Sequence, residues 1–399
     1  MQDLDHLHRA LTSAISGPPE VYVAKDKDGN QANEPISLPI YLILDPLSNT
    51  GAAYDLFRKK EFNVAMRKLL DGWGDYLKDE NSGSNSTLDA SETGWFGKCG
   101  LKHLQQCLRG QSFEQTYGVK PEEAQAKYKS WDAFFTREFK DIKTVRPIKV
   151  PEDYTPIYNA CDSYSYRVEH NVKLDDTFWL KGQNYSLYDM FGGDTKESLS
   201  AWAPKFVGGS VYQGALSSTD YHRWHSPIKG TVLATTVLPG TYYAALPDEG
   251  APAKDILAEG NPHAAIVRSL SWLSLAATRG IIIMEPQDKS SPIALVAFVA
   301  IGMMEVSTID ITVSEDGTEG KPKHVDVGDQ LGMFHFGGSS FVTVVKPKDG
   351  YEVVFKDAED KAVKIYNHIW VNEIIGRVVP QKKKDVSLCI SYLCSGTWL

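Results

Sequence analysis

Three short stretches of the chain carry residue types that can do nucleophilic or acid–base chemistry. In the first, MFHFGGSSFVTVV, Gly337, Gly338, Ser339 and Ser340 interrupt an apolar run rich in β-branched residues. Glycines inside such a run form a bulge or a tight turn, or let another group approach the main chain. Serine hydrolases place their nucleophile in GxSxG before a helix, whereas FVTVV predicts a strand. The context therefore disfavours a hydrolase.

A serine that directly follows glycine in a tight turn has a second possible reaction. The hydroxyl of Ser339 can attack the carbonyl group of Gly338 and convert the amide into an ester. Elimination from the ester leaves a dehydroalanine, which loses ammonia to become a pyruvoyl group. Gly338 has no side chain to obstruct the attack, and strain in the turn raises the energy of the starting amide. The reaction also needs a base.

The other two stretches supply a base and an acid. DYHRWHSP contains His222 and His225, and ACDSYSY contains Asp162. On a helical turn the two histidines would share a face, which suits a metal pair or two acid–base groups. We predict that no metal binds here, because HExxH is absent and the spacing supplies no third ligand. The structural alternatives are histidines that pack beside Trp224 and an aspartate that forms an Asx-turn.

The elements that must position these residues change in type along the chain. Apolar residues recur at three- and four-residue steps from Phe62 to Leu77, which predicts a helix, and a second helix is predicted at residues 101–108. The polar residues 79–89 between them predict a loop. From about Tyr154, short β-type runs alternate with glycine and proline.

The predicted fold class is α+β. It consists of a mainly helical N-terminal region at residues 1–145, a mainly β domain at residues 146–380 and an unassigned tail at residues 381–399. DKDGNQANE, residues 26–34, predicts a plain turn rather than a calcium loop, because Gln31 stands where the loop needs glycine.

Composition excludes several classes of protein. The formal net charge of -9 argues against a surface for duplex nucleic acid. The longest apolar run, residues 293–304, is shorter than the roughly 20 residues that cross a bilayer, so it predicts a buried strand and no transmembrane segment. The N-terminus lacks the pattern of a secretory signal, and the 5 cysteines show no CxxC spacing. We therefore expect a cytoplasmic protein.

Several motifs, in order between Trp131 and Glu373, resemble those of the pyruvoyl-dependent phosphatidylserine decarboxylases. They are WDAFFTREFKDIKTVRPI, ACDS, LKGQNYSLYDMFGG, STDYHRWHSPIKGTV, FVAIGMMEVSTI and VGDQLGMFHFGGSSF. Members of this family cut themselves before the serine of a Leu-Gly-Ser-Thr type motif. Here Gly337 stands where leucine is usual and loosens the turn, and Ser340 stands where threonine is usual and keeps the hydroxyl.

The resemblance implies a role for each candidate residue. The chain would cut itself between Gly338 and Ser339 and leave two fragments that stay together. His225 would be the base of this reaction, oriented by Asp162, and His222 would donate a proton in the later decarboxylation. Ser339 would become a pyruvoyl group, whose ketone forms a Schiff base with a substrate amine and accepts the electron pair left by carbon dioxide. The enzyme would need no pyridoxal phosphate.

The N-terminal region and the motifs YHRWH and FHFGGSS resemble a soluble fungal branch of the family with L-tryptophan decarboxylase activity. This implies a small-molecule amino-acid substrate with an aromatic side chain, and phosphatidylserine is the alternative. Tyr242, Tyr243 and Phe336 are candidates for an aromatic pocket wall, although core packing is the more common role of such residues. A different alternative is a non-catalytic β-barrel-like binding module, because VDVGDQLGMF resembles the pattern of carrier and barrel-sandwich domains. A pyridoxal-phosphate decarboxylase is disfavoured because no lysine has a recognisable Schiff-base context.

Overall fold

The computed structural model describes residues 4–21, 38–175, 185–247, 265–306, 308–317 and 320–381. The turn predicted at residues 26–34 and all but the first residue of the tail from residue 381 lie outside this part of the chain.

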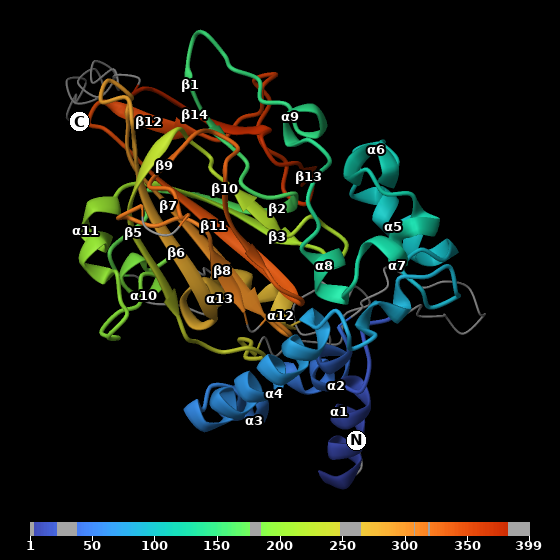
Figure 1. Cartoon of the computed structure of the whole chain (residues 1–399). Coiled ribbons are helices and arrows are strands. Elements are labelled where there is room, and N and C mark those ends of the chain that lie inside the picture. The colour runs from blue at the N-terminus through green and yellow to red at the C-terminus, as the bar shows by residue number, and fades with distance from the viewer. Residues whose placement is uncertain are drawn as a thin grey trace, which may run out of the picture.

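The N-terminal region is mainly helical, as its periodicity predicts, and its helices lie below and beside a large sheet (Figure 1). The face of α4 (Lys60–Lys78) that repeats every three or four residues is buried, because Met66, Leu70, Trp73 and Leu77 point into the core. The helices here are α1 Leu4–Ala14, α2 Pro39–Ser48, α3 Gly51–Phe57, α4, α5 Lys98–Gln106, α6 Phe113–Tyr117, α7 Ala124–Lys127, α8 Trp131–Phe135 and α9 Ile142–Val145, with 3-10 turns η1 Ser84–Thr87 and η2 Pro121–Glu123.

The loop predicted between α4 and α5 is present and contains the turn η1. The hydroxyl of Ser84 accepts a hydrogen bond of 3.1 Å from the backbone N–H of Trp131. This contact ties the loop to α8, which also packs against α4. The helical region therefore fixes the position of α8 beside the β part of the molecule.

An antiparallel sheet of eight strands forms the centre of the β part, in the order β13-β2-β3-β11-β7-β6-β5-β9. Its middle strand, β11, is buried at nearly every position because it pairs with β3 on one side and β7 on the other. The strands of this sheet are β2 Ser163–His170, β3 Ser210–Leu216, β5 Gly230–Leu238, β6 Thr278–Pro286, β7 Ile293–Met303, β9 His324–Val325, β11 Gly338–Pro347 and β13 His368–Ile369.

The two faces of the sheet pack against different layers. Helices cover one face, where Leu270 and Leu273 join the same core as Val342 and Val344. The other face packs on two three-stranded sheets, ordered β1-β14-β12 and β4-β10-β8. The remaining elements are α10 Leu187–Met190, η3 Ser200–Trp202, α11 Ala203–Phe206, α12 Ala265–Arg268, α13 Leu270–Ala276, β1 Thr155–Tyr158, β4 Arg223–His225, β8 Ile309–Ile311, β10 Gln330–Phe334, β12 Tyr351–Val354 and β14 Ile374–Pro380.

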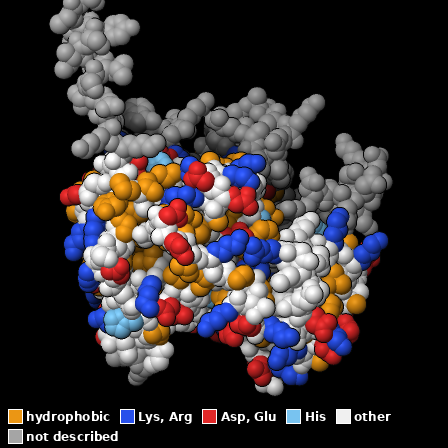
Figure 2. Space-filling view, turned by 90° about the horizontal axis from the view of Figure 1, so that it is seen from above, with side chains coloured by type: hydrophobic (Ala, Val, Ile, Leu, Met, Phe, Trp, Pro, Cys, Tyr) orange, Lys and Arg blue, Asp and Glu red, His pale blue; other side chains and the backbone are white. Residues whose placement is uncertain are grey.

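The structure confirms the predicted α+β class, and the apolar run at residues 293–304 is the buried strand β7. None of the described helices has the length and hydropathy of a membrane span. On the face shown in Figure 2, lysine and arginine side chains lie among acidic and hydrophobic ones rather than in a continuous basic field.

Candidate active site

Ser339 lies at the start of the central strand β11 and is fully buried. It stands opposite Leu216 of β3 and Gly302 of β7. Gly338 is paired with Met303 in the same ladder.

The chain turns at Gly337 between two strands, and Gly338, Ser339 and Ser340 are the first residues of β11, which corrects the prediction that GGSS interrupts a single strand. β10 ends at Phe334 and β11 begins at Gly338. Gly337 has a φ of 141°, and a Cβ there would lie only 2.3 Å from the backbone nitrogen of Val306. Only glycine fits this turn, because the conformation and the close approach both exclude a side chain.

His222 precedes strand β4, so the shared face that a helical turn would give the two histidines does not arise. Its Nδ1 atom lies 3.4 Å from the hydroxyl oxygen of Ser339. The ring stacks on Phe135 of α8, with the ring centres 3.9 Å apart. Burial lowers the pKa of His222 to about 3, so the ring is neutral at pH 7.

His225 lies at the end of β4 and has different partners. Its Nδ1 atom is 2.7 Å from the carbonyl oxygen of Gly328, and its Nε2 atom is 3.1 Å from the hydroxyl of Tyr221. Because a carbonyl oxygen only accepts, Nδ1 carries the proton and Nε2 presents a lone pair. Burial lowers the pKa of His225 to about 4, so this tautomer is maintained at pH 7.

Asp162 is paired with an arginine that the sequence reasoning did not single out. Its carboxylate receives hydrogen bonds of 3.0 and 2.5 Å from Arg146 and one of 2.7 Å from the N–H of Val371. Both side chains of the ion pair are fully buried. Among the described residues, Asp162 forms no hydrogen bond with His225, and its charge reaches that ring only through space, where it raises the pKa. The orienting role of Asp162 stays a prediction.

The loop that carries His222 is held by a buried polar network. The carboxylate of Asp220 is 2.7 Å from Nε2 of His368 and accepts a bond of 2.7 Å from the N–H of Ser217. Burial opposes ionisation of Asp220, but His368 holds its pKa below the ordinary value. Cys107 lies in the same group. Its Sγ atom is within 4.8 Å of a carboxylate oxygen of Asp220 and of a ring nitrogen of His368. The bonds to Ser217 and His368 make this group a support for the loop.

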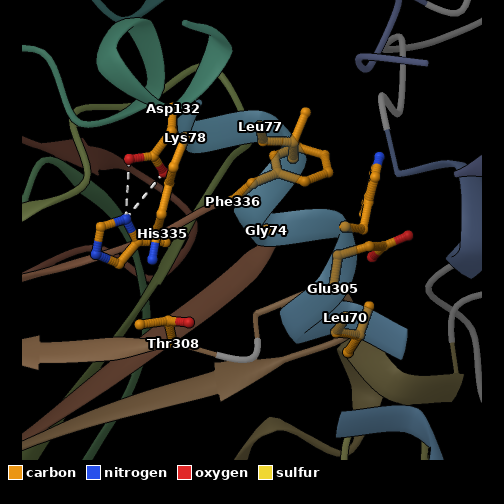
Figure 3. Close-up of a pocket in the computed structure, with 10 residues that line it drawn as sticks. Leu70, Gly74, Leu77, Lys78, Asp132, Glu305, Thr308, His335 and Phe336 are labelled. Carbon is orange, nitrogen blue, oxygen red and sulfur yellow. Dashed lines mark hydrogen bonds and ion pairs between the residues drawn. The ribbon is translucent and has the colours of Figure 1, made fainter. Parts of the chain in front are cut away.

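A pocket opens beside the cleavage turn and is shown in Figure 3. Asp132, His335 and Lys78 lie on one side of Phe336, and Glu305 lies on the other. The Nδ1 atom of His335 is 2.9 Å from the carboxylate of Asp132. The full lining is Leu70, Trp73, Gly74, Leu77, Lys78, Asp132, Glu305, Thr308, His335 and Phe336.

Of the three aromatic residues predicted to line a substrate pocket, Phe336 is the one found in this lining. Tyr242 and Tyr243 are buried in the same hydrophobic core as Phe336. The hydroxyl of Tyr243 has no hydrogen-bond partner among the described residues.

Sequence reasoning missed Arg146, Tyr221, Phe135 and Glu305. The first three lie inside the motifs WDAFFTREFKDIKTVRPI and DYHRWHSP. Tyr221 is four residues from its partner His225, whereas Arg146 and Phe135 contact Asp162 and His222 in other motifs. Glu305 had a usable signal, because it is a carboxylate at the end of the longest apolar run. A charge in that position must find a partner or shift its pKa.

Ser340 gives the first prediction, because its side chain points away from Ser339. Neighbours in a strand face opposite sides, and Val342 and Val344, which share its side, belong to the helix-covered core. The Ser340 hydroxyl is buried and has no partner among the described residues. We expect Ser340→Ala to be cut as fast as the unchanged chain and to alter the free energy of unfolding by less than about 1 kcal/mol.

Intact-mass measurements over time and urea unfolding test this prediction. A Ser340→Ala chain that stays uncut would mean that this hydroxyl takes part in cleavage.

Acid is expected to destabilise the fold through both buried histidines. Burial lowers the pKa of His222 to about 3 and of His225 to about 4, from 6.5. As the pH falls below 6.5 the unfolded chain takes up protons that the folded chain excludes, so the free energy of unfolding decreases. The slope is at most about 1.4 kcal/mol per pH unit for each histidine and ends at the folded pKa.

Urea unfolding of the Ser339→Ala chain at several pH values measures this slope. His225→Gln should have a shallower slope between about pH 6 and pH 4, because one of the two groups is gone. Identical slopes in the two chains would contradict the prediction for His225.

Comparison with known proteins gives two family models that match the chain. One is described as phosphatidylserine decarboxylase and matches residues 131–369, and the other carries the same description and matches residues 1–104. The first coincides closely with the region of ordered motifs.

Two individual relatives cover more of the chain than either family model does. It is 44% identical to the decarboxylase iboD of Amanita muscaria over 366 residues, which is 91% of this chain and 98% of that protein. It is 36% identical to the L-tryptophan decarboxylase of Psilocybe cyanescens over 345 residues, 85% of this chain and 74% of that protein. The phosphatidylserine decarboxylase proenzyme of Alcanivorax borkumensis is 28% identical over 238 residues, 57% of this chain and 73% of that protein.

Proposed function

The chain belongs to the phosphatidylserine decarboxylase family, and from this premise we propose that it is a self-processing decarboxylase of aromatic L-amino acids. The observation that carries the proposal is the buried pair Gly338-Ser339, with the serine hydroxyl 3.4 Å from His222 at the start of a central strand. Similarity to iboD over most of the chain supports a decarboxylase, and similarity to the L-tryptophan decarboxylase supports an amino acid as substrate.

In the proposed self-processing, the oxygen of Ser339 bonds to the carbonyl carbon of Gly338 and the Gly338–Ser339 amide bond breaks. Elimination then leaves Gly338 with a free carboxylate and residue 339 as dehydroalanine, which water converts into a pyruvoyl group and ammonia. His225 is proposed as the base, since its neutral Nε2 presents a lone pair. Gly338 leaves the attacked carbonyl group unobstructed.

The residues present fit a pyruvoyl group at position 339. The site is buried and the neighbouring His222 is neutral, so a carbonyl group there would be shielded from bulk water and would meet an uncharged proton carrier. Such a group supplies a ketone that reacts with the substrate amine and a sink for the electron pair left by carbon dioxide. We propose that His222, beside position 339, returns a proton to the substrate carbon.

Both fragments are expected to remain in one folded unit after cutting. β11, β12, β13 and β14 belong to the second fragment, and β11 lies between β3 and β7 of the first. Separating the fragments would expose the central ladder of the large sheet, which costs many hydrogen bonds and much apolar burial.

Decarboxylation of tryptophan, tyrosine, phenylalanine and phosphatidylserine by one preparation tests the substrate. We expect carbon dioxide from an aromatic amino acid, with tryptophan preferred. Preference for phosphatidylserine would support the alternative, a phosphatidylserine decarboxylase, instead. A full-length chain in which phenylhydrazine traps no ketone would leave the binding-module alternative.

A further inference from the structure

Glu305 lies at the end of strand β7, beside the bond that is proposed to break. Met303, two residues earlier, is the partner of Gly338 in the β7–β11 ladder. Met304 then turns the chain with a φ of 59°, in the left-handed region that non-glycine residues rarely adopt. A Cβ at Gly337 would lie 2.7 Å from the carbonyl carbon of Glu305. The backbone of Glu305 is thus packed against the cleavage turn.

One carboxylate oxygen of Glu305 is bound and the other is free. Oε1 accepts hydrogen bonds of 2.9 Å from the N–H groups of Ile40 and Tyr41, at the N-terminus of α2. Oε2 is buried and has no hydrogen-bond partner among the described residues. The residue is only 2% exposed, so bulk water does not satisfy that oxygen. A buried acceptor in this state calls for a donor from a ligand.

The surroundings bring the pKa of the Glu305 carboxyl group close to neutral pH. Burial raises the pKa of Glu305 to about 7, although the hydrogen bonds from the N–H groups of Tyr41 and Ile40 act in the opposite direction and lower it. Burial raises the pKa of the Tyr243 hydroxyl, and the charge on Glu305 raises it further.

Glu305 is also one of the residues that line the pocket of Figure 3, together with apolar side chains. Trp73 of α4 meets Phe336 edge to face, with the ring centres 5.3 Å apart. Leu70 extends this apolar wall. One polar residue and an apolar wall therefore meet at this pocket.

We propose that Glu305 binds the amino group of the substrate through its free oxygen and takes one proton from it. The ammonium group gives that proton to the carboxylate, which becomes a carboxylic acid. The nitrogen keeps the electron pair with which a neutral amine attacks a carbonyl carbon. The inference rests on the proposed function, because it assigns the site of amine recognition in that decarboxylase.

The amine, rather than the aromatic side chain, is assigned to Glu305 because of where the residue lies. The amino group is the part of the substrate that must come to position 339, and Glu305 follows directly on the strand paired with Gly338. In this proposal the aromatic side chain of the substrate packs against Trp73 and Phe336. Trp73 belongs to α4 of the N-terminal region.

The test compares Glu305→Gln with Glu315→Gln, an exposed glutamate on the surface. Each cut enzyme is treated with borohydride, which reduces the ketone at position 339 and leaves only non-covalent binding. Calorimetry then measures the affinity for tryptamine, which has the amine, and for indole-3-propionate, which has the same ring and no amine. We expect Glu305→Gln to bind tryptamine roughly ten- to a hundredfold more weakly and indole-3-propionate unchanged.

Two results would overturn the inference. One is unchanged affinity for tryptamine in Glu305→Gln, and the other is an equal loss for both ligands, which would place Glu305 at the ring or in the fold alone. A failure of the proposed function would give a different result, in which the wild-type protein releases no carbon dioxide from any amino acid.

A second measurement covers the case in which Glu305→Gln is not cut or does not fold. The affinity of the reduced unchanged enzyme for tryptamine should fall up to tenfold per pH unit below about pH 7, as Glu305 becomes protonated. An affinity independent of pH there would also overturn the inference. The titratable and charged groups around Glu305 and its pocket are Tyr41, Asp45, Tyr243, Arg268, Lys78, Asp132 and His335.

Discussion

Replacing Ser339 by alanine is expected to leave one uncut chain, with no ketone and no decarboxylase activity. The hydroxyl of Ser339 is the only group at this position that can attack the Gly338 carbonyl carbon, and alanine removes it. The fold should survive, because the strand pairing of β11 with β3 and β7 uses backbone groups. Intact mass, phenylhydrazine trapping and carbon dioxide release measure the three expected losses.

Ser340→Ala is the matched control, because it removes a buried hydroxyl from the next residue of the same strand. The pair separates loss of a nucleophile from a general disturbance of the turn. Two fragments and full activity in Ser339→Ala would refute self-processing at this residue. Loss of cutting in both variants would point to the turn rather than to the hydroxyl of Ser339.

Sequence patterns predicted the elements whose periodicity reflects burial. The apolar face from Phe62 to Leu77 became α4, and the continuous apolar run at residues 293–304 became β7, which is buried on both faces. The spacing of three between His222 and His225 fits a helical turn, whereas pairing with β10 makes Arg223–His225 a strand. Tertiary pairing thus overrode a local pattern only three residues long.

The chemistry of the site was predictable in its residue types but not in its contacts. Ser339 and His222 are 117 positions apart in the chain, so their approach depends on how the sheets stack. The same holds for Glu305 and the N–H groups of α2, which are separated by more than 260 positions. The pairing of Asp162 with Arg146 was missed because an aspartate in a turn-like stretch carries no sign of a buried partner.

The second large effect is expected at the two histidines. His225→Ala should stay uncut or cut at least about a hundredfold more slowly, because it removes the proposed base, whose tautomer Gly328 fixes. His222→Ala should be cut but release carbon dioxide roughly a hundred- to ten-thousandfold more slowly, because the proton carrier beside position 339 is lost. The fraction of cut chain over time measures the first effect, and turnover per trapped ketone measures the second.

Normalising turnover to the ketone is what separates the two roles, since a chain that is never cut also has no activity. Urea unfolding of both variants shows whether the fold is kept, because each substitution empties a similar buried volume. The opposite pattern, with His222→Ala uncut and His225→Ala cut, would assign the base to the histidine that lies 3.4 Å from Ser339 in the uncut chain. His225, held by Gly328 and Tyr221, would then act through the position of its neighbours rather than on the bond itself.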